Sequence, residues 1–173
     1  MKASKEKPQF TFEPLGSTHD RAAFACEEPK LEHYLKTQAR QDVGKKIAAV
    51  FVMTQDGKTI AGFYTLSNYT IRNSDIPEEI TRKLTKQGEI PATLIGRLAR
   101  HTAFRGTGAG DLLLMDALRR CLSVSKQTAS WAVVVEAKNQ GGTVFYKKFG
   151  FMAFPNHSLK LFMPLGTIEQ LFA

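Results

Sequence analysis

Hydrophobic residues recur along this chain with two periods, which predict strands alternating with helices. Apolar residues that alternate with polar ones, or form short continuous runs, predict β-strands. These segments are 10–15, 47–54, 59–71, 91–100, 132–135, 151–154 and 159–163. Apolar residues spaced three and four positions apart, with capping residues at their starts, predict α-helices. These segments are 20–24, 28–39, 74–88, 111–122 and 144–148. Strands joined by helices in this order predict an α/β (α+β) fold with a mixed central sheet flanked by helices.

A glycine-rich segment lies between the predicted strand 91–100 and the predicted helix 111–122. It is Arg105-Gly106-Thr107-Gly108-Ala109-Gly110. Backbone N–H groups at a helix N-terminus favour an anion, most readily a phosphate, and glycine lets a ligand approach without meeting a Cβ. Its spacing, R-x-x-G-x-G, differs from the dinucleotide-fold and P-loop motifs. We therefore expect phosphate binding of another kind, with an ordinary flexible β–α turn as the alternative.

The bulk composition is that of a globular protein. For 173 residues with 43% hydrophobic content, we expect a flexible N-terminus at 1–9 and a single domain over 10–173. No run approaches the roughly 18 apolar residues of a membrane span, and the charged first residues lack the apolar core of a secretory signal. We expect a cytoplasmic protein that has no membrane partner. Cys26 and Cys121 are predicted to be reduced thiols, and no metal is expected, because the histidines form no ligand spacing.

The net charge of +8 favours a polyanionic partner. A phosphorylated cofactor needs only a few of these charges, so nucleic acid is an open prediction as substrate or partner, with plain solubility as the alternative. The candidates for phosphate contact are basic residues on, or just after, the predicted helices. They are Lys36, Arg40, Lys45, Lys46, Arg82, Lys83 and Lys86. For any one of them, a solvated charged face is equally consistent.

The glycine-rich segment resembles the acyl-CoA pyrophosphate turn of the GNAT acetyltransferases. The segment 145–151 is similar to that family's F-Y-x-x-x-G-F signature, and the order of elements matches the GNAT fold over nearly the whole chain. The resemblance implies acetyl-CoA as cofactor, with its pantetheine arm along a strand that splays from its neighbour at a bulge. The implied cofactor-binding residues are Leu98, Ala99, Arg100, Arg105, Gly106, Thr107, Gly108, Ala109, Gly110, Asn139 and Phe145. For Asn139, stabilising a turn is the alternative.

Four further segments resemble the acetyltransferase toxins of type II toxin–antitoxin systems. They are 35–42, 62–67, 97–100 and 161–165. This resemblance implies acetyl transfer to the α-amino group of aminoacyl-tRNA and arrest of translation, with the basic residues named above as candidates for contacting tRNA phosphates. It also implies a homodimer, neutralisation by a ribbon-helix-helix antitoxin, and repression of the operon through operator DNA bound by the complex.

Tyr146 is the candidate general acid. A phenol has a reference pKa of about 10 and is protonated at pH 7, and the resemblance implies that this one protonates the leaving thiolate. The alternative is a core aromatic on an amphipathic helix. The amine of an aminoacyl ester is substantially neutral at physiological pH, so a strong base is unnecessary. Glu136 and His101 are candidates to relay a proton through water, but a structural role is the stronger expectation for each, and the base stays unassigned.

Two other functions are consistent with the sequence. The first is a GNAT acetyltransferase of a small amine or a protein N-terminus, although the scarcity of clustered carboxylates argues against a cationic acceptor. The second is a non-catalytic regulatory module that binds CoA or nucleic acid. An assay with labelled acetyl-CoA separates these two functions from acetylation of aminoacyl-tRNA: the label goes to charged tRNA, to another acceptor, or to none.

Overall fold

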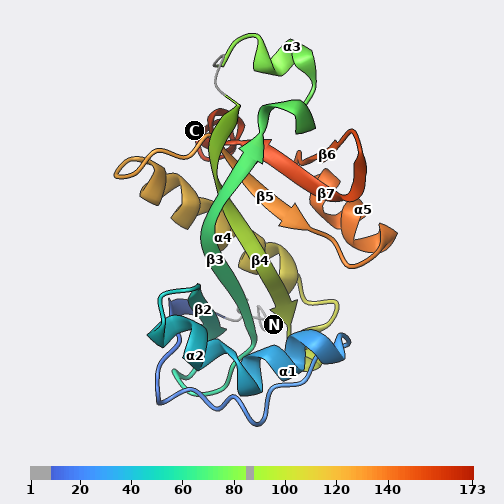
Figure 1. The fold of residues 1–173 in the computed structure, drawn as a ribbon. Helices are drawn as coiled ribbons and strands as arrows, with labels where there is room; N and C mark the ends of the chain where they lie inside the picture. Colours follow the sequence, from blue (N-terminus) through green and yellow to red (C-terminus); the bar gives the residue numbers. More distant parts are fainter. Residues whose placement is uncertain (1–8, 85–87) are drawn as a thin grey trace. The chain divides into compact units, whose positions relative to one another are not determined.

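A mixed sheet forms the centre of the fold in the computed structural model, which describes residues 9–84 and 88–173 (Figure 1). The strands are β1 Thr11–Pro14, β2 Ala49–Thr54, β3 Gly62–Arg72, β4 Glu89–Arg100, β5 Ala132–Glu136, β6 Met152–Phe154 and β7 His157–Pro164. Among the described residues these seven strands follow one another across the sheet in the order β1-β2-β3-β4-β5-β7-β6. The β4–β5 pair is parallel, whereas β1–β2, β5–β7 and β6–β7 are antiparallel.

Helices connect these strands, as the sequence predicts for an α/β fold. They are α1 Pro29–Thr37, α2 Ala39–Gly44, α3 Glu78–Thr81, α4 Ala109–Ser125, α5 Gln140–Lys148 and α6 Leu165–Leu171. The parallel strands β4 and β5 need a crossover connection, and α4 provides it. Within the described part of the chain, no helix combines the length and the apolar character needed to cross a bilayer.

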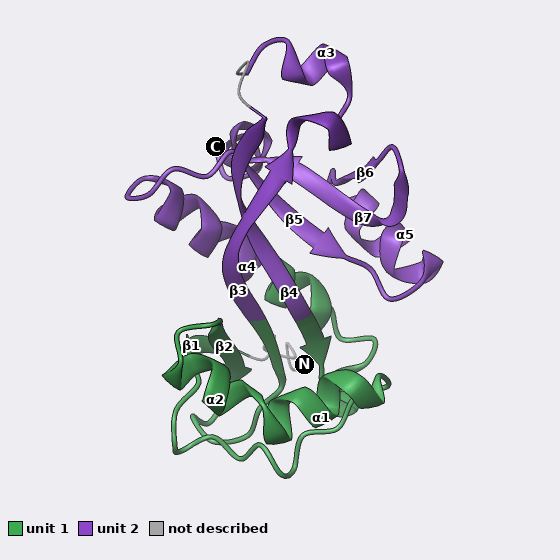
Figure 2. Cartoon of the chain, viewed as in Figure 1, with its two compact units in different colours: residues 1–64, 98–114 green, residues 65–97, 115–173 purple. Residues whose placement is uncertain are grey.

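The chain divides into two compact units (Figure 2). Unit 1 comprises Met1–Tyr64 and Leu98–Leu114, and unit 2 comprises Thr65–Arg97 and Met115–Ala173. The strands β3 and β4 and the helix α4 each contribute residues to both units. Each unit contains its own buried apolar cluster, and a single domain over 10–173 stays a prediction.

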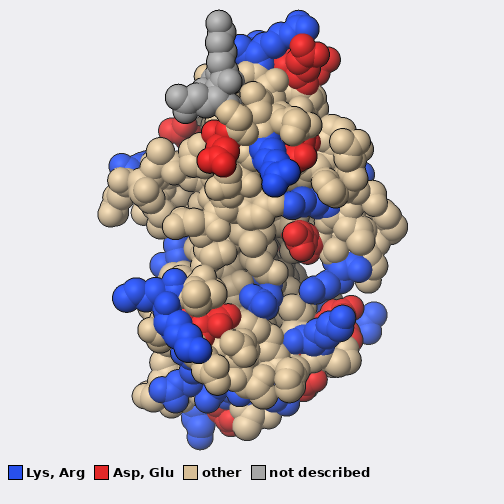
Figure 3. Space-filling view, in the orientation of Figure 1, with Lys and Arg blue, Asp and Glu red and all other residues tan. Residues whose placement is uncertain are grey.

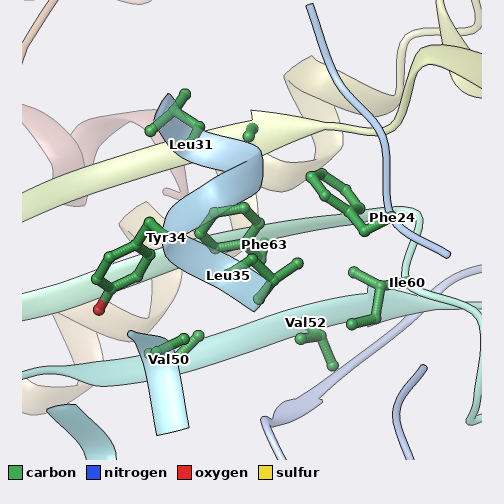
Figure 4. Close-up of a cluster of buried hydrophobic side chains, with 10 residues drawn as sticks. Phe24, Leu31, Tyr34, Leu35, Val50, Val52, Ile60 and Phe63 are labelled. Carbon is green, nitrogen blue, oxygen red and sulfur yellow. The ribbon is translucent and has the colours of Figure 1, made fainter. Parts of the chain in front are cut away.

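The apolar cluster of unit 1 is built around α1 (Figure 4). Leu31, Tyr34 and Leu35 follow the three- and four-residue spacing of a helix face, and all three are buried. The ring of Phe63, from β3, stacks on Tyr34 and meets the edge of Phe24, with ring centroids 6.3 Å and 5.5 Å apart. The predicted stripe of this helix is therefore confirmed, including Pro29 in its first turn, where a missing N–H is tolerated.

The apolar cluster of unit 2 surrounds β5. Val133, Val134 and Val135 are all fully buried, as expected for a strand covered on both faces. Phe162 of β7 packs against Phe154 of β6 at a ring-centroid distance of 4.9 Å. The continuous apolar run at 132–135 thus forms the buried strand that the sequence predicts.

A buried carboxylate ties α2 to α1 in unit 1. Asp42 is 9% exposed, and its two oxygens accept hydrogen bonds from the Tyr34 hydroxyl at 2.8 Å and the Gln38 amide at 3.1 Å. Burial of a carboxylate is costly unless such donors compensate it. This pair of bonds therefore stabilises the turn between the two helices.

Replacing Tyr34 with phenylalanine is expected to lower the free energy of unfolding by about 1.5 kcal/mol, because one donor to a buried carboxylate is lost. Urea denaturation followed by circular dichroism measures the change. Tyr146→Phe is the matched control, since no hydrogen bond to the Tyr146 hydroxyl is found among the described residues, and it should leave stability nearly unchanged. Equal stability of Tyr34→Phe and wild type would show that this bond contributes nothing.

Three predicted helices differ from those observed. The helix predicted at 20–24 is wrong: Asp20 forms a β-bridge with Thr59, so its backbone is extended and only a turn follows. The helix predicted at 28–39 is interrupted at Gln38, where α2 begins a new segment. Of the helix predicted at 74–88, residues 85–87 lie outside the described residues, and the described part forms a 3₁₀ turn and the short α3, because the residue before Pro77 is held extended.

Other boundaries shift toward the N-terminus, and one helix is missed. The helices α4 and α5 begin at Ala109 and Gln140, two and four residues before the predicted starts. The helix α6 was not predicted. Both cysteines are free thiols, as predicted: Cys121 is buried, which raises its pKa to about 12, and Cys26 is half-buried.

Candidate active site

The glycine-rich turn in unit 1 presents an open backbone in front of α4. Gly106 and Gly108 have φ angles of +77° and +82°, and a Cβ at either position would have no atom within 4 Å. Both glycines are exposed, and Gly110 is already the second residue of the helix. An L-residue rarely adopts these φ values, so glycine is required by backbone geometry rather than by crowding.

The side chain of Thr107 shapes this turn. Its hydroxyl donates a hydrogen bond to the Phe104 carbonyl at 2.5 Å and accepts one from the Ala109 N–H at 3.4 Å. The first regular bond of the helix follows, from the Leu112 N–H to the Gly108 carbonyl at 3.2 Å. The 17-residue helix α4 behind the turn provides the positive dipole end that favours an anion.

The strand β4 leads into this turn and continues beyond its pairing with β5. The parallel register joins Ala92–Ile95 to Ala132–Val135, and Gly96–Arg100 extend β4 further. In unit 1 the side chain of Ala99 is buried in the apolar cluster. A ligand that uses residues 98–100 would therefore bind their backbone groups, as the resemblance implies.

A neighbouring segment, residues 25–27, holds the end of β4 in place, and no sequence motif marks this segment. Arg100 forms an ion pair with Glu27 at 3.3 Å and donates to the His101 carbonyl at the same distance. The backbone N–H of Thr102 donates to the Ala25 carbonyl at 2.9 Å. The pKa of the Glu27 carboxyl is lowered chiefly by a hydrogen bond from its own backbone N–H, and to a smaller extent by the positive charges of Arg100 and Arg105. These contacts fix the chain just before the turn.

The two candidates for a proton relay have different surroundings. His101 accepts the Ala103 N–H at its Nδ1 at 2.9 Å, and its Nε2 faces the Ala23 carbonyl at 3.3 Å. Both ring nitrogens of His101 therefore have structural partners, which favours the structural role. Glu136 ends β5 as an exposed residue opposite Lys160 of β7. The structure assigns no base.

Tyr146 lies on α5 in unit 2, within a group of aromatic rings. It is 8% exposed, and the rings of Phe145 and Phe151 meet it edge-on at centroid distances of 5.2 Å and 5.5 Å. Burial raises the pKa of Tyr146 to about 12. The residue thus has the packing of a core aromatic, and its catalytic role stays a prediction.

Asn139 is the N-cap of α5. Its side-chain oxygen accepts the Gly142 N–H at 3.0 Å, which is the usual role of asparagine at this position. This bond matches the turn-stabilising alternative. It occupies one acceptor site of the amide, and contact with a pantetheine arm stays a prediction.

Figure 3 shows several basic side chains on the visible face of unit 1, among acidic and uncharged ones. Lys36 pairs with Glu32 at 3.0 Å, whereas Arg40, Lys45 and Lys46 are exposed. In unit 2, Arg82 pairs with Glu78 at 3.2 Å and Lys83 is exposed, and Lys86 lies outside the described residues. The predicted phosphate contacts therefore fall into two groups, one in each unit.

Known proteins match this chain over almost its whole length. A chain from Sinorhizobium fredii described as "Probable toxin TacT" is 33% identical over 92% of this chain and 93% of its own. A "tRNA-acetylating toxin" from Mycobacterium tuberculosis is 29% identical over 91% of this chain and 93% of its own.

Solved structures of similar toxins have the same fold. AtaT complexed with acetyl-methionyl-tRNAfMet has a TM-score of 0.88 and 27% identity, covering 95% of this chain and 100% of that one. A mutant of AtaT bound to acetyl-CoA and the C-terminus of the antitoxin AtaR has a TM-score of 0.82 and 26% identity, covering 95% and 98%. The KacTA–DNA complex has a TM-score of 0.79 and 27% identity, covering 95% of this chain and 98% of that one.

The model of the "Acetyltransferase (GNAT) family" matches residues 15–151. This span contains β4, the glycine-rich turn, α4 and Tyr146. The chain therefore belongs to the GNAT family of acetyltransferases.

Proposed function

We propose that this chain transfers the acetyl group of acetyl-CoA to the α-amino group of aminoacyl-tRNA and acts as the toxin of a toxin–antitoxin pair. The observation that carries the proposal is the likeness, over 95% of this chain, to AtaT complexed with acetyl-methionyl-tRNAfMet. The similar tRNA-acetylating toxin of Mycobacterium tuberculosis supports the same acceptor.

The residues of unit 1 fit acetyl-CoA. The backbone N–H groups of Gly106, Gly108 and Gly110 would hold the pyrophosphate, because the turn is exposed and no Cβ obstructs the approach. The backbone of 98–100 would hold the pantetheine arm. When bound, acetyl-CoA supplies an acyl group activated as a thioester.

Tyr146 supplies the proton of the reaction in this proposal. The acceptor amine bonds to the acyl carbon while the carbon–sulfur bond breaks, and the phenol gives its proton to the departing sulfur. Because burial raises the pKa of Tyr146 to about 12, the phenol is protonated at every physiological pH. The amine releases its own proton to water, and water returns a proton to the tyrosinate, so the phenol is restored and no base is assigned.

The raised pKa of Tyr146 has a measurable consequence. An ordinary tyrosine ionises near pH 10, but this one should ionise only toward pH 12. The difference in tyrosinate absorbance between wild type and Tyr146→Phe should therefore be nil near pH 10 and appear only above about pH 11. Because this phenol ionises near pH 10 in the unfolded chain, the free energy of unfolding of wild type is unaffected by the group below about pH 10 and declines as the pH rises toward 12. A difference already present near pH 10 would contradict the burial of this hydroxyl.

The positive charge of unit 1 supports tRNA, a polyanion, as the acceptor of the acetyl group. The exposed cations on and just after α2, which are Arg40, Lys45 and Lys46, would contact tRNA phosphates, which supply affinity without sequence choice. We extend the proposal to arrest of translation in the cytoplasm, a homodimer, and neutralisation by a ribbon-helix-helix antitoxin that represses the operon with the toxin. The AtaT–AtaR and KacTA–DNA complexes of similar proteins support an antitoxin and an operator as partners.

An acceptor assay tests the function. The chain is incubated with labelled acetyl-CoA and methionyl-tRNA, and the amino acid is recovered after mild alkaline release from the tRNA. We expect label on the α-amino group. Label on a polyamine or a protein N-terminus, with none on charged tRNA, would select the other acetyltransferase function. Tight acetyl-CoA binding without any labelled acceptor would select a regulatory module.

A further inference from the structure

The C-terminus of α2 ends in a turn with an unusual residue in its left-handed position. The Ile47 N–H donates to the Asp42 carbonyl at 2.9 Å, and the Lys46 N–H donates to the Val43 carbonyl at 3.1 Å. These two bonds define a Schellman motif. Lys46 occupies its left-handed position with a φ of +58°, where glycine is usual. Among the described residues other than glycine, it alone has a positive φ.

The same turn holds a large apolar side chain in solvent. Ile47 is 63% exposed, and Val43 one turn before it is 38% exposed. In a Schellman motif, the residue at the position of Ile47 commonly packs on an apolar residue at the position of Asp42. Here that position is a buried carboxylate bonded to Tyr34 and Gln38, so the usual apolar partner is replaced by a polar one.

Three exposed cations lie within three residues of these apolar residues along the chain. Arg40, Lys45 and Lys46 are exposed on α2 and its final turn. The acidic residue of this segment, Asp42, is buried and turned to its two donors. The surface therefore combines a small apolar centre with positive charges, and its backbone is held by hydrogen bonds before any partner arrives.

We propose that this α2 tip (Val43, Lys45, Lys46 and Ile47) is a contact surface for RNA, in which the lysines contact phosphates and Ile47 covers the face of a ribose or base. This inference rests on the proposed function, which brings tRNA to unit 1. Charge complementarity favours a polyanion, and ribose and base faces between phosphates offer an apolar partner for Ile47. A preorganised turn reduces the entropy lost on binding.

The salt dependence of the reaction separates the two kinds of contact. Ile47→Ser is expected to raise KM for methionyl-tRNA about fivefold at every salt concentration, because apolar contact is lost. Lys46→Ala should instead reduce the slope of log KM against log salt by roughly 0.7 to 0.9, the effect of one phosphate contact. Lys46→Gly should show the same reduced slope while its Tm rises by about 3 °C, because glycine relieves the left-handed strain.

Matched controls lie elsewhere on the surface. Val124→Ser removes an apolar side chain that is 41% exposed on α4, and Lys58→Ala removes an exposed cation from the 55–58 turn. Both should leave KM and its salt slope unchanged. Ile47→Ser should have the same Kd for acetyl-CoA and the same Tm as wild type.

The outcomes distinguish this inference from the function on which it rests. If wild type acetylates methionyl-tRNA but Ile47→Ser and Lys46→Ala match it in KM and slope, the α2 tip proposal is overturned while the function stands. If Lys58→Ala and Val124→Ser change KM and its salt slope as much as the α2 tip variants do, the effect comes from surface charge or surface polarity in general. That result also overturns the α2 tip proposal. If wild type acetylates no charged tRNA, the proposed function is wrong, and the α2 tip proposal, which depends on it, is overturned with it.

Discussion

Replacing Tyr146 with phenylalanine is expected to lower kcat for acetyl transfer to methionyl-tRNA at least tenfold, and about a hundredfold if the phenol contributes as a typical general acid. The substitution removes the proton donor while keeping the ring that packs against Phe145 and Phe151. Its stability and its Kd for acetyl-CoA should therefore stay close to those of wild type. Steady-state kinetics, with isothermal calorimetry for acetyl-CoA, measures both effects.

Tyr34→Phe is the matched control for this prediction. It removes a hydroxyl that bonds to buried Asp42, so it should lower stability and leave kcat unchanged. Tyr146→Phe is therefore expected to lower kcat without lowering stability, and Tyr34→Phe to lower stability without lowering kcat. Equal kcat of Tyr146→Phe and wild type would remove the general-acid assignment and leave Tyr146 as a core aromatic.

Replacing Gly108 with alanine is expected to raise KM for acetyl-CoA about a hundredfold, because the added methyl group would keep the pyrophosphate away from the backbone N–H groups of the turn, and a hydrogen bond to a charged group is worth about 1.5 to 3 kcal/mol. The φ of +82° is strained for alanine, and the new Cβ would stand in the open space where we place the pyrophosphate. The strain itself should lower the free energy of unfolding by about 1 kcal/mol. Kinetics at varied acetyl-CoA and a urea titration measure the two effects separately.

Gly57→Ala provides the control for backbone strain. Gly57 has a φ of +76° in the 55–58 turn, again with no atom within 4 Å of a Cβ. Gly57→Ala should lower the free energy of unfolding as much as Gly108→Ala does, and its KM for acetyl-CoA should equal that of wild type. If both glycine variants leave KM unchanged, the turn before α4 does not bind the cofactor.

Local patterns were sufficient where one segment carries its own signal. The stripe of Leu31, Tyr34 and Leu35 predicted the buried face of α1, because helical spacing places these residues on one side. The apolar run 132–135 predicted β5, because a strand buried on both faces has no polar positions. The glycine-rich segment predicted a turn before a helix, and the structure contains that turn, with positive φ at Gly106 and Gly108.

Local patterns failed where a distant segment decides the backbone. Asp20 is extended because its N–H donates to Lys58, 38 residues later, at 2.8 Å. The helix α6 follows Pro164 and buries Leu165 and Ile168, whereas the sequence pattern predicted no element after the strand 159–163. No motif marked Glu27 or the exposed Ile47, because their roles arise from Arg100 and from the turn around Asp42.

By itself, the sequence determined the fold class, the family, the cofactor and the residues proposed to carry the chemistry, because those depend on motifs with fixed spacing along the chain. Only the tertiary structure decided that Asp42 is buried between two donors and that Lys46 adopts a left-handed backbone beside an exposed Ile47. Burial and backbone conformation at these positions depend on hydrogen bonds to the preceding helix and on packing. Periodicity along the chain does not encode these contacts.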